Sequence, residues 1–179
     1  MDNRLRLFDG QSDYVLEIND STVKPDVLRF RGREALNIPF SWDIEFTVPA
    51  MNIPPEQILM KYAILRMRSG KVVYGVLTQL EWLSTSVDQS HYRVILESRL
   101  ALLSHTRSSG VFLNQSVPEV VEGILRQHGL EGPDFDFRLE RTYPPRELIT
   151  QWRETDLQFI QRLLSEVGIW FRSEMQSAT

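Results

Sequence analysis

Residues 143–171 have the sequence YPPRELITQWRETDLQFIQRLLSEVGIWF, which predicts a strand, a helix and a second strand in succession. Thr155 precedes Gln158 by three residues, the spacing of a capping box, so we expect the helix to begin there. Gly168 suits the left-handed residue that ends a helix, and Ile169 is placed to pack back on the last turn in a Schellman motif. The helix is therefore delimited at both ends by its own sequence.

Apolar residues of this helix recur with helical periodicity, which predicts one buried face. They are Leu157, Ile160, Leu164 and Val167, with Phe159 and Leu163 beside them. Residues 147–153 are expected to be extended, because Pro144-Pro145 disfavours helix at the entry. Residues 169–171 are expected to form the next strand. The stretch contains no obvious nucleophile, metal ligand or phosphate-binding loop.

The composition is that of a soluble globular protein. Of the 179 residues, 42% are hydrophobic and 25% are charged. A chain of this length and composition can bury a sizeable core. No apolar run approaches the roughly 20 residues that span a bilayer, and the first ten residues, MDNRLRLFDG, lack the apolar core of a signal peptide. We therefore expect no export by the general secretory route.

Charge and cysteine content exclude several classes of function. The net charge is −4, and the basic residues are scattered, so a nucleic-acid surface is disfavoured. The chain has no cysteine. Disulfides, cysteine nucleophiles and thiolate metal sites are excluded.

The first hundred residues have the pattern of short antiparallel strands. Residues 5–7 and 14–18 could form a hairpin around Asp9-Gly10, and a third strand begins at Val27. Residues 40–48 alternate between apolar and polar side chains, as a strand with one covered face requires. Its apolar positions are Phe40, Trp42, Ile44, Phe46 and Val48. A single helical turn is expected over 54–59.

A hairpin is expected at Ser69-Gly70, between strands at 62–68 and 71–82. In the second of these we expect one face to be buried, and Gly75 to mark a bulge or bend. That face comprises Val72, Tyr74, Val76, Thr78, Leu80 and Trp82. A further strand at 91–98 and a helical turn at 100–103 complete about seven strands, which favours a small barrel or sandwich.

The pattern changes near residue 105, after a polar patch at 105–110. A short strand at 111–113 leads to a helix that begins with a capping box, Ser116 with Glu119, and ends at Gly129. Another strand is expected over 134–141. The fold class is therefore mainly β to α+β: a small antiparallel β-barrel in residues 1–105, followed by the start of an α+β domain in residues 106–179.

Candidates for chemistry are sparse. His91, His105 and His128 do not share a ligand spacing, so ordinary structural roles are favoured over metal binding. Asp134 and Asp136 would share one face of a strand, as a hydrolase or cation site could use, but a solvated face is favoured. No nucleophile elbow, dinucleotide fingerprint or Walker lysine is present. We expect no catalytic, cofactor-binding or metal-binding residues and no cofactor.

A dense charged cluster precedes the second helix. It comprises Arg146, Glu147, Arg153, Glu154 and Asp156. The simpler interpretation is that Glu154 and Asp156 stabilise the helix amino terminus through its dipole. The alternative is an ion-pair network that fixes a protein interface.

Three segments together resemble the VgrG spike proteins of the type VI secretion system, which are related to the hub of contractile phage tails. The main motif is Tyr143-Pro144, Arg146-Glu147, Gln151-Trp152, Glu154, Asp156-Leu157, Phe159, Arg162-Leu163-Leu164, Glu166 and Gly168-Ile169. Upstream, FRGREALNIPFSWDIEF (30–46) and FLNQSVPEVVEGILRQHGL (112–130) resemble the family as well. The chain departs at Trp152, where tyrosine is usual, and at Val167, where an acidic residue is common.

The resemblance implies a structural role and no enzymatic activity. Family members form homotrimeric hubs of tail-tube-like barrels that cap the hexameric Hcp tube and carry effectors, with membrane contact only by puncturing. Such a protein would be in the bacterial cytoplasm during assembly and then be injected through the apparatus. The chain would hold the first barrel and the beginning of the next domain, either as a fragment or as a natural truncation. Part of the apolar face of Leu157, Ile160 and Leu164 would then lack its partner.

Two alternatives remain open from sequence. One is a baseplate hub of a prophage contractile tail. The other is a self-contained β-barrel that binds a ligand or carbohydrate through exposed aromatic rings. Its candidate residues are Trp42, Trp82, Tyr74 and Tyr62. Burial of these rings in the core would remove that site.

Overall fold

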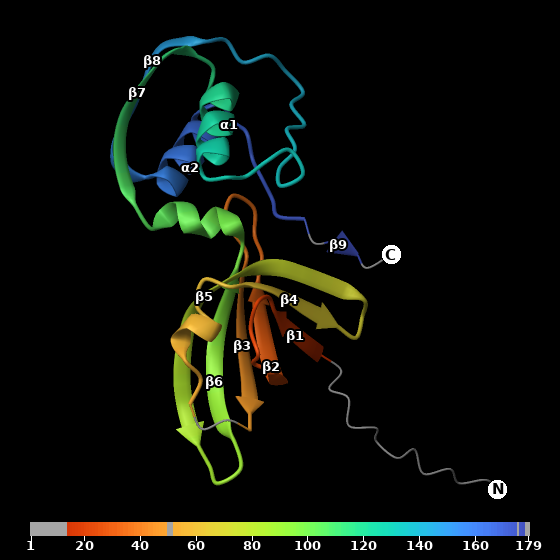
Figure 1. Cartoon of the computed structure of the whole chain (residues 1–179). Helices are drawn as coiled ribbons and strands as arrows, with labels where there is room; N and C mark the ends of the chain where they lie inside the picture. The colour runs from red at the N-terminus through yellow and green to blue at the C-terminus, as the bar shows by residue number, and fades with distance from the viewer. Residues whose placement is uncertain (1–13, 50–51, 175, 178–179) are drawn as a thin grey trace, which may run out of the picture. The chain divides into compact units, whose positions relative to one another are not determined.

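The chain forms two compact units, seen in a computed structural model that describes residues 14–49, 52–174 and 176–177 (Figure 1). The first unit takes in the described parts of Met1–Glu34, Phe40–Ser98 and Ser173–Thr179. The second consists of Ala35–Pro39 and Arg99–Arg172. The contiguous domains 1–105 and 106–179 stay a prediction.

The first unit is a closed antiparallel barrel, which confirms the fold class expected from sequence. Its six strands follow the order β4-β1-β2-β3-β6-β5, and β5 pairs with β4 to close the ring. The strands are β1 (Tyr14–Ile18), β2 (Asp26–Arg33), β3 (Ser41–Val48), β4 (Tyr62–Met67), β5 (Lys71–Thr85) and β6 (Ser90–Glu97). A short strand β9 (Gln176–Ser177) pairs with the start of β5, and a 3₁₀ turn η1 (Pro55–Gln57) precedes β4. The expected strand at 5–7 lies outside the described residues.

Strand β3 forms the centre of the barrel core, as its alternation predicts. All five apolar side chains assigned to one face are buried, and Phe46 stacks on Tyr92 of β6 with ring centroids 5.9 Å apart. Burial of one such side chain contributes about 1.5–3 kcal/mol. Trp42 packs beside Phe30 of β2, and Gly32 leaves room for its indole ring.

The expected buried face of β5 is wrong in part. Val73 and Leu77 contribute to the core, whereas Tyr74 and Trp82 are exposed. Up to Leu77 the core face is the one that carries Val73, so Tyr74 points outward. After the register shift between Leu77 and Gln79 the two faces exchange, and Leu80 packs against the core. Thus no single alternation describes the strand.

The second unit packs two helices against a two-stranded antiparallel ribbon. Its elements are η2 (Arg99–Ser104), β7 (Arg107–Gln115), α1 (Val117–Gln127), β8 (Arg146–Thr155) and α2 (Asp156–Glu166). Both predicted capping boxes are confirmed, at Ser116 and at Thr155. Gly129 and Gly168 both have φ of 72°, as their positions after the helices require.

The apolar face of α2 is covered at Ile160 and Leu164, contrary to the expectation that part of it lacks a partner, and is partly exposed at Leu157. Ile160 and Leu164 are buried, and Leu157 packs against the same core at partial exposure. Phe159 and Leu163 are completely inaccessible to solvent. Helix α1, the turn η2 and strand β8 pack against this face of α2.

Two expected strands are absent from the described structure. Residues 134–141 are irregular, because their side chains bond locally: Asp134 accepts from the backbone N–H of Glu131, and Asp136 pairs with Arg138. Residues 169–171 are irregular too, since Phe171 bonds to Asn37 instead of joining a sheet. The polar patch at 105–110 was expected to be a loop. Strand β7 begins at Arg107, so most of this patch is strand.

Candidate interaction surface

The three histidines lie in separate environments. His91 Nε2 is 3.0 Å from Glu45 Oε2, outside hydrogen-bond geometry, and His128 Nε2 is 2.6 Å from Asp156 Oδ2. His105 is exposed between η2 and β7. Among the residues the structure describes, no group of three carboxylates or histidines is arranged to hold a metal ion.

Asp134 and Asp136 do not share the strand face that a hydrolase site would need. Asp134 Oδ2 lies 3.1 Å from Arg99 Nη1 and accepts a 2.8 Å hydrogen bond from the Glu131 backbone. Asp136 pairs with Arg138 at 2.8 Å in an exposed position. Each carboxylate stabilises its own part of the loop, so the structure gives the hydrolase hypothesis no site.

The four aromatic residues of the ligand-binding alternative do not converge. Trp42 is buried in the barrel core. Tyr62 and Tyr74 are exposed on neighbouring strands β4 and β5, and Trp82 is exposed towards the far end of β5. The expected site is therefore wrong at Trp42, and ligand binding by the three exposed rings stays a prediction.

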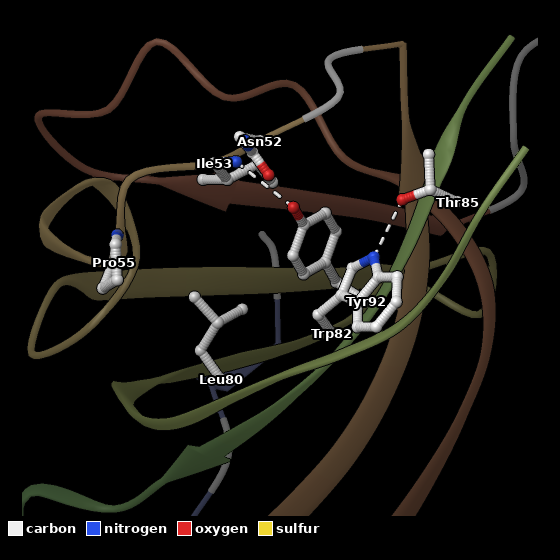
Figure 2. A pocket seen from close by; sticks show the side chains of 7 residues that line it. All are labelled: Asn52, Ile53, Pro55, Leu80, Trp82, Thr85 and Tyr92. Carbon is white, nitrogen blue, oxygen red and sulfur yellow. Dashed lines mark hydrogen bonds between the residues drawn. The ribbon is translucent and has the colours of Figure 1, made fainter. Parts of the chain in front are cut away.

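Trp82 borders an open hollow of about 490 Å³ in the barrel unit (Figure 2). The lining side chains are uncharged: Asn52, Ile53, Pro55, Leu80, Trp82, Thr85 and Tyr92. The Tyr92 hydroxyl accepts from the Ile53 backbone at 3.2 Å, and Trp82 Nε1 donates to Thr85 Oγ1 at 2.8 Å. These polar groups therefore already make hydrogen bonds within the protein.

Two members of the charged cluster before α2, Arg146 and Glu154, belong to an internal network centred on Arg162. Arg162 donates to Glu154 at 2.5 and 3.1 Å and to Glu166 at 2.9 Å, and also to the carbonyl oxygen of Thr150. The hydrogen bond to Glu154 is the main cause that raises the pKa of Arg162. Arg146 reaches Glu166 at 2.6 Å and, more than Arg162, holds the pKa of that carboxyl below its usual range. The network ties β8 to α2.

Asp156 has the helix-end role expected from sequence. It occupies the first turn of α2, where a carboxylate is favourable to the helix dipole. Its two oxygens contact Gln151 Nε2 at 2.7 Å and His128 at 2.6 Å. It therefore also joins the start of α2 to β8 and to the end of α1.

An uncovered apolar face lies on the ribbon of β7 and β8. Val111 and Leu113 are each 61% exposed, Leu148 is 56% exposed and Trp152 is 69% exposed. Leu113 is opposite Leu148, and Val111 is opposite Thr150, so these side chains share one face. We call the side chains of Val111, Leu113, Leu148, Thr150 and Trp152 the ribbon face.

The opposite side of the ribbon is buried against the helices, where Ile149 and Gln151 are covered and Phe112 stacks on Phe159. The ribbon face was not predicted from sequence. The available signal was Leu148 and Trp152 on one face of the strand and Ile149 on the other. A strand with apolar residues on both faces is expected to be covered by protein on both faces.

One end of the ribbon face is positively charged. The guanidinium of Arg153 lies 5.2 Å from the centroid of the Trp152 ring, and Arg107 Nη1 donates to the Arg153 carbonyl at 2.8 Å. Within the described ranges, neither arginine has an ion-pair partner. The face thus combines aromatic, aliphatic and cationic groups, the mixture enriched at protein interfaces.

Membrane insertion through a helix has no candidate in the described part of the chain, where each helix is too short or too polar to cross a bilayer.

The most informative curated relative is the type VI secretion system spike protein VgrG5 of Pseudomonas aeruginosa. It is 36% identical over 170 residues, which cover 94% of this chain and 22% of that protein. The chain spans about a fifth of the length of the first curated relatives it matches. The resemblance to VgrG proteins is confirmed for this region.

Solved structures agree with that relationship. The Escherichia coli c3393 protein, described as a type VI secretion component similar to the phage T4 tail proteins gp27 and gp5, is 45% identical, with a TM-score of 0.85. The match covers 88% of this chain and 44% of that one. A 43 kDa tail protein of prophage MuSo2 from Shewanella oneidensis shares the fold at 15% identity, with a TM-score of 0.63 over 87% of this chain and 48% of that one.

The family model for the phage tail baseplate hub (GPD) matches residues 33–179, which include four of the six barrel strands, β3 to β6, and the whole of the second unit. The chain belongs to the phage tail baseplate hub family.

Proposed function

We propose that this chain is a structural part of a type VI secretion spike. In this role three copies form a hub that caps the Hcp tube, and the assembly punctures a membrane and delivers effectors. The chain would be in the bacterial cytoplasm during assembly and would leave through the apparatus itself. It would contribute shape and contact surface, with no catalytic step.

The relationship to the c3393 protein is the observation that carries the proposal. A 45% identical structure described as a type VI secretion component overlaps nearly the whole of this chain. The phage-tail relatives share the fold at 12–15% identity, which speaks for common architecture alone. A type VI role is therefore favoured over a prophage baseplate.

The site chemistry supports the same role. Arg146, Glu154 and Asp156 join elements of the second unit, and an exposed apolar face lies on its ribbon. Apolar faces of this kind mark interaction surfaces. A hub subunit needs such surfaces for its neighbours.

A co-sedimentation experiment tests the proposal. Preassembled Hcp tubes would be mixed with the full-length protein that carries this chain, and pelleted. We expect the protein to pellet with the tubes and to saturate at a low ratio set by the number of tube ends. Fragmenting the tubes by shearing should raise the bound amount in proportion to the new ends. Binding in proportion to tube length, or no binding, would contradict a capping role.

A further inference from the structure

We propose that Asn37 is a clasp residue that couples the stability of the second unit to that of the barrel. It lies in the loop Ala35–Pro39, which connects the barrel strands β2 and β3 in sequence but belongs to the second unit. Unfolding of either unit would therefore remove contacts that stabilise the other. The inference goes beyond the hub role and is independent of it.

Asn37 forms a reciprocal pair of hydrogen bonds with Phe171. The Asn37 backbone N–H donates to the Phe171 carbonyl oxygen at 2.9 Å, and the Phe171 backbone N–H donates to Asn37 Oδ1 at 3.0 Å. The side-chain amide thus takes the place of a peptide carbonyl, and a single residue supplies both halves of a bond pair like that of an antiparallel ladder. A side chain without an acceptor oxygen would keep only the first of these bonds.

The backbone conformation at residue 37 restricts which residues can make this pair. Its φ of 63° is in the left-handed region, which asparagine adopts more readily than most residues that carry a side chain. Glycine suits the same φ but has no acceptor. Asparagine therefore satisfies the backbone and the hydrogen bond together.

The carbonyl oxygen of Asn37 is bound as well, because Gln161 of α2 donates to it from Nε2 at 2.8 Å. We call the hydrogen bonds of Asn37 with Phe171 and Gln161 the clasp. Phe171 packs at partial exposure against the core of the second unit, and the chain rejoins the first unit at Ser173. The clasp thus holds the loop to α2 and to the last segment of the second unit.

The two ends of the loop are fixed by the barrel. Arg33, the last residue of β2, is opposite Ser41, the first residue of β3. While these strands are paired, the loop is short and closed, so it loses little further conformational freedom when the clasp forms. Once the strands separate, ordering the loop costs more free energy than a few exposed hydrogen bonds supply. The clasp therefore depends on the folded barrel, and by linkage the barrel is stabilised by the clasp to the same extent.

Hydrogen exchange of the Phe171 amide, resolved by NMR in the 179-residue chain, reports the clasp directly. We expect Asn37→Ala and Asn37→Gly to speed this exchange at least about tenfold at fixed pH, because each removes the acceptor. Asn37→Gly separates loss of the acceptor from backbone strain. Asn37→Asp keeps an acceptor oxygen and should stay within about threefold of the parent. Unchanged exchange in Asn37→Gly would overturn the role of the side chain.

Gln161→Met tests the coupling between the units. It removes one bond of the clasp from the α2 side and keeps a good helix former, without altering the loop itself. We expect amide exchange to quicken about threefold or more in α2, and by a similar factor in the barrel strand β3. A contact that served the second unit alone would change the exchange of α2 and leave that of β3 at the parent rate.

Gln158→Ala is the matched control on the same helix. It removes the acceptor that Gln158 Oε1 provides to the Thr155 backbone N–H, and so weakens the start of α2 without altering any bond of the clasp. Exchange in α2 should quicken while exchange in β3 stays at the parent rate. Unaltered β3 exchange in Gln161→Met, or an equal effect of Gln158→Ala on β3, would overturn coupling through Asn37.

Discussion

Gly75 of β5 lies so close to Glu97 of β6 that a Cβ at residue 75 would be 2.4 Å from the Glu97 carbonyl oxygen. The strand changes partner at this point: Gly75 is opposite Ala63 of β4, and the next residue, Val76, pairs both with β4 and with Glu97. The barrel closes where these three strands meet. Only a residue without a side chain fits there.

Gly75→Ala is expected to destabilise the barrel by about 1–3 kcal/mol, because the added methyl group meets backbone that cannot move without opening the seam. The measurement is urea unfolding followed by circular dichroism. Gly123→Ala in α1 is the matched control, since its Cβ would meet nothing within 4 Å. In a helix interior this change should stabilise by about 0.5–1 kcal/mol. Equal effects at the two positions would contradict closure at Gly75.

Arg162→Met is expected to destabilise the second unit by about 1–3 kcal/mol, because it leaves Glu154 and Glu166 without their shared donor. Arg162→Lys should recover little of this, since one ammonium cannot reproduce the forked contacts. Hydrogen exchange of α2 and β8 amides reports the loss. The control is Arg138→Met, whose pair with Asp136 is largely exposed and should contribute within about 0.5 kcal/mol. A similar loss of stability from Arg162→Met and Arg138→Met would contradict the role assigned to Arg162.

Glu119 is expected to make the stability of α1 depend on pH. The Ser116 backbone N–H, and after it the Ser116 hydroxyl, hold the pKa of Glu119 below its ordinary value. Its contribution is therefore fully present above the unfolded glutamate pKa of about 4.3 and is lost as the pH falls through the lower folded value.

Glu119→Gln keeps an acceptor for the capping box but removes this titration. We expect the variant to lose less stability than the parent between pH 7 and pH 3, measured by urea unfolding at each pH. An identical pH dependence for Glu119→Gln and the parent would remove the proposed cause.

Elements governed by local chemistry could be predicted from sequence. The limits of both helices follow from residues within four positions of each end, such as Ser116 with Glu119 and Gly168 after α2. The alternation of β3 was equally informative, because a single face of that strand is apolar. These features need no knowledge of distant partners.

Features that depend on distant partners could not be predicted in this way. Gly75 indicated a bulge or bend in β5, but the register shift that exchanges its faces lies between Leu77 and Gln79, where no residue marks it. Residues 134–141 contain strand-forming residues, but Asp134 bonds to Arg99 and the expected ladder never forms. The ribbon face was missed for a related reason: alternation identifies two faces, and only the packed structure shows which one is left uncovered.

The oligomeric state of the full-length protein tests the central claim most directly. Light scattering coupled to size-exclusion chromatography would give its mass in solution, and the 179-residue chain alone would be measured beside it. The hub role predicts a mass three times that of one full-length chain, with the shorter chain monomeric or weakly associating. A full-length protein that remains monomeric at high concentration would contradict the account.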